Sequence, residues 1–170
     1  MILVLDADAL IKLNRLGMLA KAATVFRCLI SEEVYRESVL EARIHGYPDA
    51  EDLAAVIATH LQVLNPPQME PPEPGLGPGE TSAFALAITL PGSTPHAIVS
   101  DDRQFLRFLL REEVPLLTSI SVILLMVESG VVTFQDGRRA LILLRPYIRE
   151  ADYARALLDI EQRERSQAPQ

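Results

Sequence analysis

"VLDADALIKL" (residues 4–13) joins a short apolar run to a helix-like pattern through two acids. The apolar residues 2–5 predict a buried strand, and those at 9, 10, 11 and 13 predict the inward face of a helix. Asp6 stands at the boundary, where an aspartate commonly accepts hydrogen bonds from the free N–H groups of a helix start. The stretch therefore predicts a strand, a turn and a helix, and capping explains Asp6 without any function.

The same alternation continues through the first 118 residues. Apolar runs that predict strands occupy residues 2–5, 25–30, 61–64, 97–99 and 115–118. Helix-like patterns occupy residues 9–23, 32–45, 50–59, 80–90 and 102–112. This order is typical of an α/β domain with a mainly parallel central sheet and helices on both of its faces.

Residues after 118 carry only helical patterns. Ser119 is the expected cap of the helix that follows it, Thr133 with Asp136 resembles a capping box, and residues 149–165 form an amphipathic last helix. We expect a single domain over 1–170, with an α/β core in 1–118, C-terminal helices in 119–165 and a disordered tail in 166–170. The proline-rich residues 65–80 predict an exposed loop that leads into a functional site of the domain.

Composition narrows the class of protein. The 170 residues suit one domain, and the longest apolar run, residues 120–127, is far shorter than the ~20 residues that cross a bilayer. No secretion signal stands at the N-terminus, so we expect no membrane association and a cytoplasmic location. The lone Cys28 lies in an apolar stretch, which predicts a small buried side chain.

The net charge of −7 argues against a large basic surface for nucleic acid. It does not exclude an enzyme that acts on nucleic acid, because metal-binding carboxylates add negative charge that bound cations neutralise. The basic residues are 14 arginines and 2 lysines. The guanidinium group of arginine matches phosphate through paired N–H donors, which the ammonium group of lysine does not offer.

Acids stand where several predicted strands end. Asp6 follows the first strand, Asp101 and Asp102 follow the strand at 97–99, and Glu80 opens the next-to-last helix of the core. Glu37 lies between apolar positions of its own helix. Each acid alone is explained as a cap or a solvated residue. Gathered at one edge of a parallel sheet they would repel one another unless a divalent cation held them, and carboxylates suit Mg2+ or Mn2+.

Four segments in order, "VLDADALIKL", "LISEEVYRE", "GPGETSAFALA" and "AIVSDDRQF", resemble PIN-domain proteins over roughly residues 1–150. The similarity is to VapC-type ribonuclease toxins and related prokaryotic PIN nucleases. It implies a three-layer α/β/α PIN-like domain, here with extra C-terminal helices. The implied activity is a ribonuclease that hydrolyses RNA phosphodiester bonds with one or two Mg2+ or Mn2+ ions. The resemblance also implies a homodimer and, for a toxin, a cognate antitoxin that covers the site.

The resemblance assigns roles to particular residues. The catalytic and metal-binding acids are Asp6, Glu37, Glu80 and Asp102, with Asp101 as a further or alternative ligand. Ser100 and Asp8 are expected to support these ligands. The candidates for contacts to RNA phosphates are Arg103, Arg107, Arg138 and Arg139. Three positions depart from the family pattern. Asp8 stands where the family usually has Ser or Asn, Glu80 stands where many toxins have Asp, and Gln104 stands where many carry a further acid.

Two other functions remain open from the sequence. A haloacid dehalogenase-like phosphatase would use Asp6 and Asp8 as its paired acids, but that family places Thr where Ala9 stands and needs a lysine that no residue after Lys21 supplies. A PIN-like fold without catalysis would serve as a binding scaffold. Chelator-controlled assays on RNA and on small phosphate esters distinguish the three.

Overall fold

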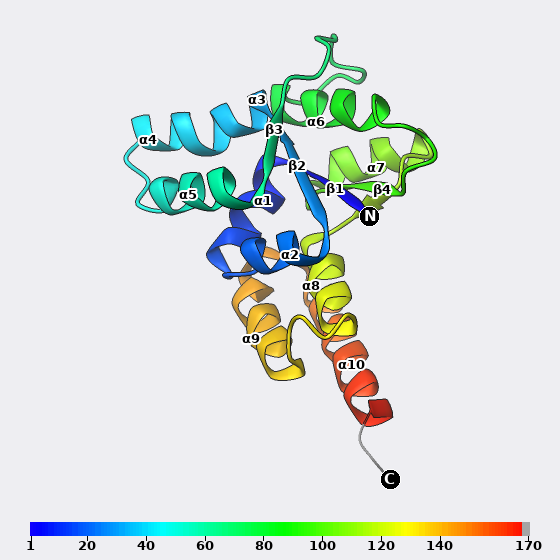
Figure 1. The fold of residues 1–170 in the computed structure, drawn as a ribbon. Coiled ribbons are helices and arrows are strands. Elements are labelled where there is room, and N and C mark those ends of the chain that lie inside the picture. The colour runs from blue at the N-terminus through cyan, green and yellow to red at the C-terminus, as the bar shows by residue number, and fades with distance from the viewer. Residues whose placement is uncertain (168–170) are drawn as a thin grey trace.

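The computed structural model describes residues 1–167 and has a five-stranded sheet at its centre (Figure 1). The strands lie in the order β3-β2-β1-β4-β5, and every neighbouring pair is parallel. Their bounds are Ile2–Leu5 (β1), Arg27–Ser31 (β2), Gln62–Leu64 (β3), His96–Val99 (β4) and Leu116–Leu117 (β5). The expected parallel sheet is therefore confirmed.

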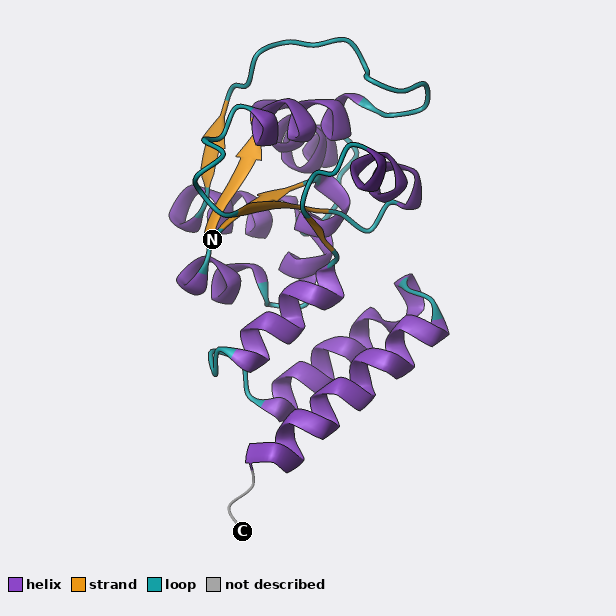
Figure 2. Ribbon diagram, turned by 90° about the vertical axis from the view of Figure 1, so that its right-hand side faces the viewer, coloured by secondary structure: helices purple, strands orange, loops and turns teal. Residues whose placement is uncertain are grey.

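Helices cover both faces of this sheet (Figure 2). One face packs against α1 (Ala7–Arg15), α2 (Leu19–Val25), α5 (Ala50–His60) and α8 (Ser119–Glu128), and the other against α6 (Pro78–Ile88) and α7 (Arg103–Arg111). This arrangement confirms the three-layer α/β/α architecture.

The central strand β1 shows why the sheet needs helices on both sides. Leu3 and Leu5 point into the core beneath α1 and α8, whereas Ile2 and Val4 point into the core beneath α6 and α7. Successive side chains of a strand face opposite sides, so a strand that is apolar at every position is buried from both. Cys28 of β2 packs in the first of these cores, as predicted, and burial raises the pKa of its thiol to about 12.

The C-terminal helices lie below the sheet in Figure 1, and their buried residues extend the core that lies beneath α1 and α8. Here α8 packs against α9 (Phe134–Leu144) and α10 (Glu150–Gln167), and a 3₁₀ turn, η2 (Arg145–Tyr147), precedes α10. Thr118 rather than Ser119 caps α8, and Thr133 accepts from the backbone N–H of Asp136 as predicted. The last helix continues through residues 166 and 167, where we expected a tail, and 168–170 lie outside the described residues.

Two of the expected helices are interrupted. Residues 9–23 divide because Gly17 adopts a left-handed conformation, with φ of +65°, between α1 and α2. Residues 32–45 contain α3 (Glu32–Tyr35), a π-helical segment η1 (Arg36–Glu41) and α4 (Ala42–Ile44). Several boundaries also shift: α6 begins at Pro78 rather than 80, and the last strand shrinks from 115–118 to two residues.

The proline-rich loop runs over residues 65–77, since the rest of the expected loop belongs to α6. Its second half is attached to α7. The Gln104 side chain donates from Nε2 to the carbonyl oxygen of Pro74 at 2.9 Å, and Arg111 forms an ion pair with Glu73. No helix within residues 1–167 is both long and apolar enough to cross a membrane.

We expect Gly137→Ala to destabilise the C-terminal helices. A Cβ atom at this position of α9 would lie 2.5 Å from Cγ2 of Val127 and 3.2 Å from Cδ1 of Ile160. Valine is stiff about χ1 and cannot easily move away, so we expect a loss of about 1–2 kcal/mol in the free energy of unfolding. Urea denaturation measures it, with Gly92→Ala as the control because a Cβ there meets open space. Equal stability of the Gly137→Ala and wild-type proteins would contradict this close packing.

Candidate functional site

The two central strands place the candidate site. From β1 the chain passes to β2 on one side, while β4 lies on the other side of β1, so the chain order reverses between β1 and β4. Ligands of open α/β sheets bind outside the carboxyl ends of the strands at such a point. Asp6 follows β1 there, and its backbone N–H donates to the carbonyl oxygen of Val99 at the end of β4, at 3.1 Å. Ser100, Asp101 and Asp102 come next in the chain.

Asp6 is the most buried acid of this region, with only 3% of the residue exposed. Its Oδ1 accepts the backbone N–H of Ala9 at 2.8 Å, so the residue does cap α1. Burial raises the pKa of its carboxyl group to about 7. The hydrogen bonds from Ser100 and Ala9 oppose this shift, and the nearby charges of Asp8 and Asp101 add to it. No Lys, Arg or His of the described residues forms an ion pair with Asp6.

Lys12, which the sequence analysis did not single out, lies between two of the other acids. Its Nζ is 2.5 Å from Oδ2 of Asp8 and 3.3 Å from Oδ2 of Asp101. Burial alone would lower the pKa of Lys12, but its hydrogen bond and charge interactions with the two aspartates outweigh burial and raise it. The spacing of Asp8 and Lys12, four residues apart on one helix, was the available signal.

Asp101 and Asp102 point to different surroundings. The Asp101 side chain is 7% exposed, and its Oδ1 accepts the backbone N–H of Ser119 at 3.0 Å. Asp102 is exposed and caps α7, where its Oδ1 accepts the N–H of Phe105 at 2.8 Å. Ser100 is fully buried, and its Oγ accepts the N–H of Asp102 at 3.1 Å. Asp101 is thus the inward member of the pair.

Glu37 and Glu80 form a second group, at the start of α6. Oε1 of Glu37 accepts the backbone N–H of Gly79 at 3.0 Å, and a Cβ at Gly79 would lie 2.2 Å from Oε2 of Glu37. Burial raises the pKa of Glu37, the Gly79 N–H opposes the rise, and the charges of Glu33 and Glu41 favour it. Glu80 accepts the N–H of Gly77 and so caps its own helix. The need for glycine at 79 was not recognised from the sequence.

The backbone around Glu37 is unusual. The residue lies in the π-helical segment η1, whose turns are wider than those of an α-helix. Such segments are rare and occur often at functional sites. The wide turn carries Glu37 to the N-terminus of α6, where free backbone N–H groups favour an anion.

Among the described residues, no three His, Cys, Asp or Glu side chains lie close enough together to hold a metal ion. The donors around Asp6 nevertheless suit a hard cation. Capping occupies one oxygen of Asp6, and Mg2+ is commonly held by one or two carboxylates with water or phosphate completing its shell. The Ser119 hydroxyl beside Asp101 is buried and has no hydrogen-bond partner among the described residues. Asp6 and Asp101 offer carboxylate oxygens to such an ion. Both oxygens of Asp101 are engaged, with the Ser119 N–H and with Lys12, so Asp101 would bind an ion only by leaving one of these partners.

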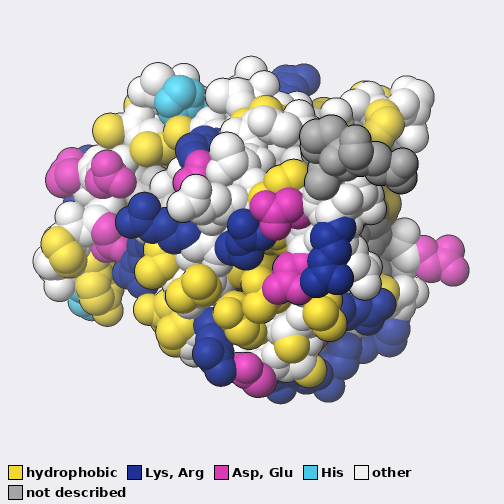
Figure 3. Space-filling view, turned by 90° about the horizontal axis from the view of Figure 1, so that it is seen from below, with side chains coloured by type: hydrophobic (Ala, Val, Ile, Leu, Met, Phe, Trp, Pro, Cys, Tyr) yellow, Lys and Arg dark blue, Asp and Glu magenta, His cyan; other side chains and the backbone are white. Residues whose placement is uncertain are grey.

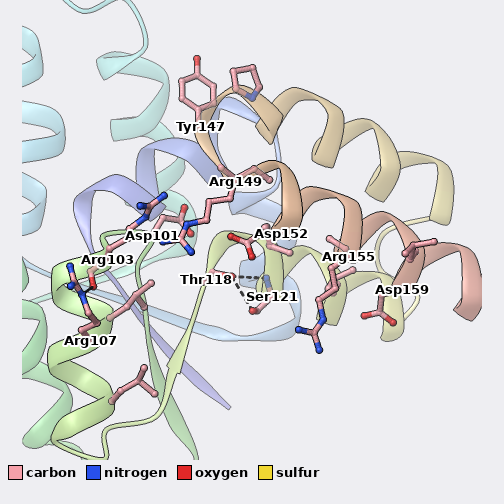
Figure 4. A pocket seen from close by; sticks show the side chains of 18 of the residues that line it. Asp101, Arg103, Arg107, Thr118, Ser121, Tyr147, Arg149, Asp152, Arg155 and Asp159 are labelled. Carbon is pink, nitrogen blue, oxygen red and sulfur yellow. Dashed lines mark hydrogen bonds between the residues drawn. The ribbon is translucent and has the colours of Figure 1, made fainter.

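The four arginines expected to contact RNA occupy two places. Arg103 and Arg107 lie on α7 and line a groove that Asp101 also lines (Figure 4). Arg138 and Arg139 lie on α9, outside that groove, and Arg138 forms an ion pair with Glu164.

Comparison with known proteins gives one match. A family model described as PIN domain matches residues 2–161, nearly the whole chain. No curated protein and no solved structure matches the chain significantly.

We expect the Asp6 carboxylate to destabilise the metal-free protein at high pH. Its folded pKa of about 7 exceeds the value of 3.8 for a free aspartate, so the folded state binds more protons, and stability rises as pH falls from 8 toward 5. Asp6→Asn should therefore have a higher melting temperature than wild type at pH 8. We expect its free energy of unfolding to be larger by about 2–4 kcal/mol there, and this difference should shrink at pH 5. Thermal melts in EDTA measure this, with the exposed Glu112→Gln as control. A pH-independent difference would contradict it.

Proposed function

The chain belongs to the PIN domain family, whose members are generally nucleases, and we propose that it is a metal-dependent endoribonuclease that hydrolyses RNA phosphodiester bonds. The observation that carries this proposal is the buried carboxylate of Asp6 at the point where the strand order reverses. It has no basic partner among the described residues, and the acids nearest to it are Asp8 and Asp101. A cation is what this arrangement lacks.

In this proposal Asp6 and one or both of Asp101 and Asp102 hold the Mg2+ or Mn2+ ion. A bound ion would lower the pKa of a water molecule and stabilise charge on the phosphodiester. Ser100 orients Asp6 through its hydroxyl and the loop through the N–H of Asp102. Lys12 holds Asp101 in place and lowers the charge repulsion between Asp101 and Asp8.

Glu37 and Glu80 have a less direct role in this proposal. Both carboxylates accept backbone N–H groups at the start of α6. The contact of Glu37 with Gly79 fixes that helix relative to η1, whereas Glu80 caps its own helix. Either acid becomes a ligand only by leaving its N–H partner or by sharing its second oxygen. The number of ions, one or two, depends on whether they do so.

Other functions receive less support. A phosphatase of the haloacid dehalogenase type would need Asp8 beside the reacting group, whereas the Asp8 side chain is 51% exposed and bound to Lys12. A PIN-like binding scaffold without activity would not need a buried acid lacking a basic partner. A toxin role with an antitoxin, a homodimer and a cytoplasmic location stay predictions from the resemblance. The gene next to this one is the simplest test of the toxin role.

The purified protein should cleave single-stranded RNA with Mn2+ or Mg2+ and not with EDTA. Asp6→Asn should lower the cleavage rate at least about 100-fold while the protein stays folded, because it removes the central ligand charge. Asp101→Asn and Asp102→Asn, tested separately, show which of the two acids serves the ion. Circular dichroism checks the fold of each variant. Cleavage of equal rate by wild type and Asp6→Asn, or cleavage that EDTA leaves unchanged, would contradict the proposal.

Gly79→Ala should impair cleavage as Glu37→Gln does. The added methyl group occupies the space of the Glu37 carboxylate, so both changes remove the contact between η1 and α6. We expect each to lower the rate about tenfold or more. Glu33→Gln is the matched control, because Glu33 lies one turn away and pairs with Arg36 instead. Full activity of Glu37→Gln with loss in Glu33→Gln would show that the wrong acid of this segment was chosen.

A further inference from the structure

A groove leads away from the acidic site along the C-terminal helices. It has a volume of about 1330 Å³ and lies between α7, α8, η2 and α10, with Asp101 among the residues that line it. Figure 4 shows Arg103 and Arg107 on the α7 side and Arg149, Asp152 and Arg155 on the α10 side. The groove therefore reaches Asp101, one of the candidate metal ligands, and is built partly from helices that follow the α/β core.

The arginines of this groove differ from most others in the chain. Elsewhere a carboxylate usually pairs with the guanidinium, as in the ion pairs of Arg15, Arg36, Arg43, Arg111, Arg138, Arg145, Arg163 and Arg165. By contrast, Arg103, Arg107, Arg149 and Arg155 are exposed and form no ion pair with any described residue. The chain is acidic overall, yet it leaves four guanidinium groups unpaired around one hollow.

Apolar side chains are also exposed in the groove. Leu110, Tyr147 and Leu158 are 65%, 61% and 57% exposed, respectively. Figure 3, seen from the side of the C-terminal helices, shows hydrophobic side chains gathered on this face with basic and a few acidic side chains among them. A single nucleic-acid strand presents charged phosphates together with flat, largely apolar bases, and proteins bind it with basic grooves and aromatic platforms.

We propose that this groove binds single-stranded nucleic acid and guides it to the acidic site. Arg103 and Arg107 contact phosphates from α7, Arg149 and Arg155 contact them from the α10 side, and Tyr147 stacks on a base. This inference rests on the proposed nuclease function and adds a path for its substrate. It assigns the C-terminal helices a part in binding RNA.

An acidic peptide is the main alternative occupant. Two features favour a nucleic acid. Asp101, one of the acids proposed to hold the metal ion, lines the groove, and the basic groups of the groove are all arginines, which match phosphate through paired N–H donors. Of the acids that line the groove, Asp159 pairs with Arg163 and Asp101 with Lys12. Asp152 forms no ion pair with a described residue, so the four unpaired arginines outnumber the one unpaired acid.

The test measures binding separately from cleavage. A fluorescent single-stranded oligoribonucleotide is titrated with the full-length Asp6→Asn protein, and anisotropy is recorded at several salt concentrations. Adding Arg149→Ala with Arg155→Ala should weaken binding about tenfold or more and reduce the salt slope by about one to two. Tyr147→Leu should weaken binding with no change in that slope, because it removes stacking but no charge.

Two double variants of equal charge change are the controls. Arg27→Ala with Arg165→Ala should leave binding unchanged, because Arg27 starts β2 at the opposite edge of the sheet and Arg165 is 80% exposed near the end of α10. Arg138→Ala with Arg139→Ala tests a path over α9 instead. Loss of affinity in this variant but not in the Arg149 and Arg155 variant would overturn the proposal that RNA binds in the groove.

The outcomes separate the groove from the nuclease function. If the wild type cleaves RNA and the Arg149 and Arg155 variant binds it with unchanged affinity, only the proposal that RNA binds in the groove is overturned. Arginine-dependent binding without any wild-type cleavage overturns the nuclease function and leaves the groove as a binding site. If neither binding nor cleavage of RNA occurs, both are wrong, and an acidic peptide becomes the better occupant.

Discussion

The charge of Asp6 is the constraint around which the site is arranged. A carboxylate with 3% exposure loses most of its hydration, and its pKa rises accordingly. The protein compensates with an N–H group of α1 and the Ser100 hydroxyl, but not with an ammonium or guanidinium group of the described residues. Lys12 is engaged with Asp8 and Asp101. The fold thus places an acid that has no basic partner among the described residues at the end of its central strand, which is the basis of the proposed cation site.

The sheet makes this arrangement possible. Because β1 and β4 are neighbours and parallel, the residues that follow them meet at the same edge, although 94 residues separate Asp6 from Ser100 in the chain. The alternating pattern of the sequence was enough to predict this, since short apolar strands between helices favour a parallel sheet. It also predicted that acids stand at the strand ends. Capping does not by itself rule out ligand binding, because a cap such as that of Asp102, whose Oδ1 accepts the N–H of Phe105, uses only one oxygen of the carboxylate.

Other features depended on contacts that a sequence does not display. The ion pair of Lys12 with Asp101 joins α1 to the loop after β4, and the fit of Glu37 against Gly79 joins η1 to α6. Both are set by how helices pack on the sheet, which periodicity alone does not give. The break at Gly17 and the π-helical turn were missed for a related reason: the apolar spacing on either side continues that of one helix. The sequence also did not show which arginines stay unpaired, or that they line a groove.

The two halves of the proline-rich loop differ in how they are attached to the rest of the domain. Residues 73–75 are fastened to α7 through Glu73 and Pro74, and α7 is the helix that Asp102 caps. Residues 65–72 have no side-chain attachment of this kind among the described residues. Homologous chains are therefore free to gain or lose residues in the first half, whereas a length change in the second half would pull on the segment that carries the acids. Variation in loop length among relatives should accordingly end abruptly before Glu73.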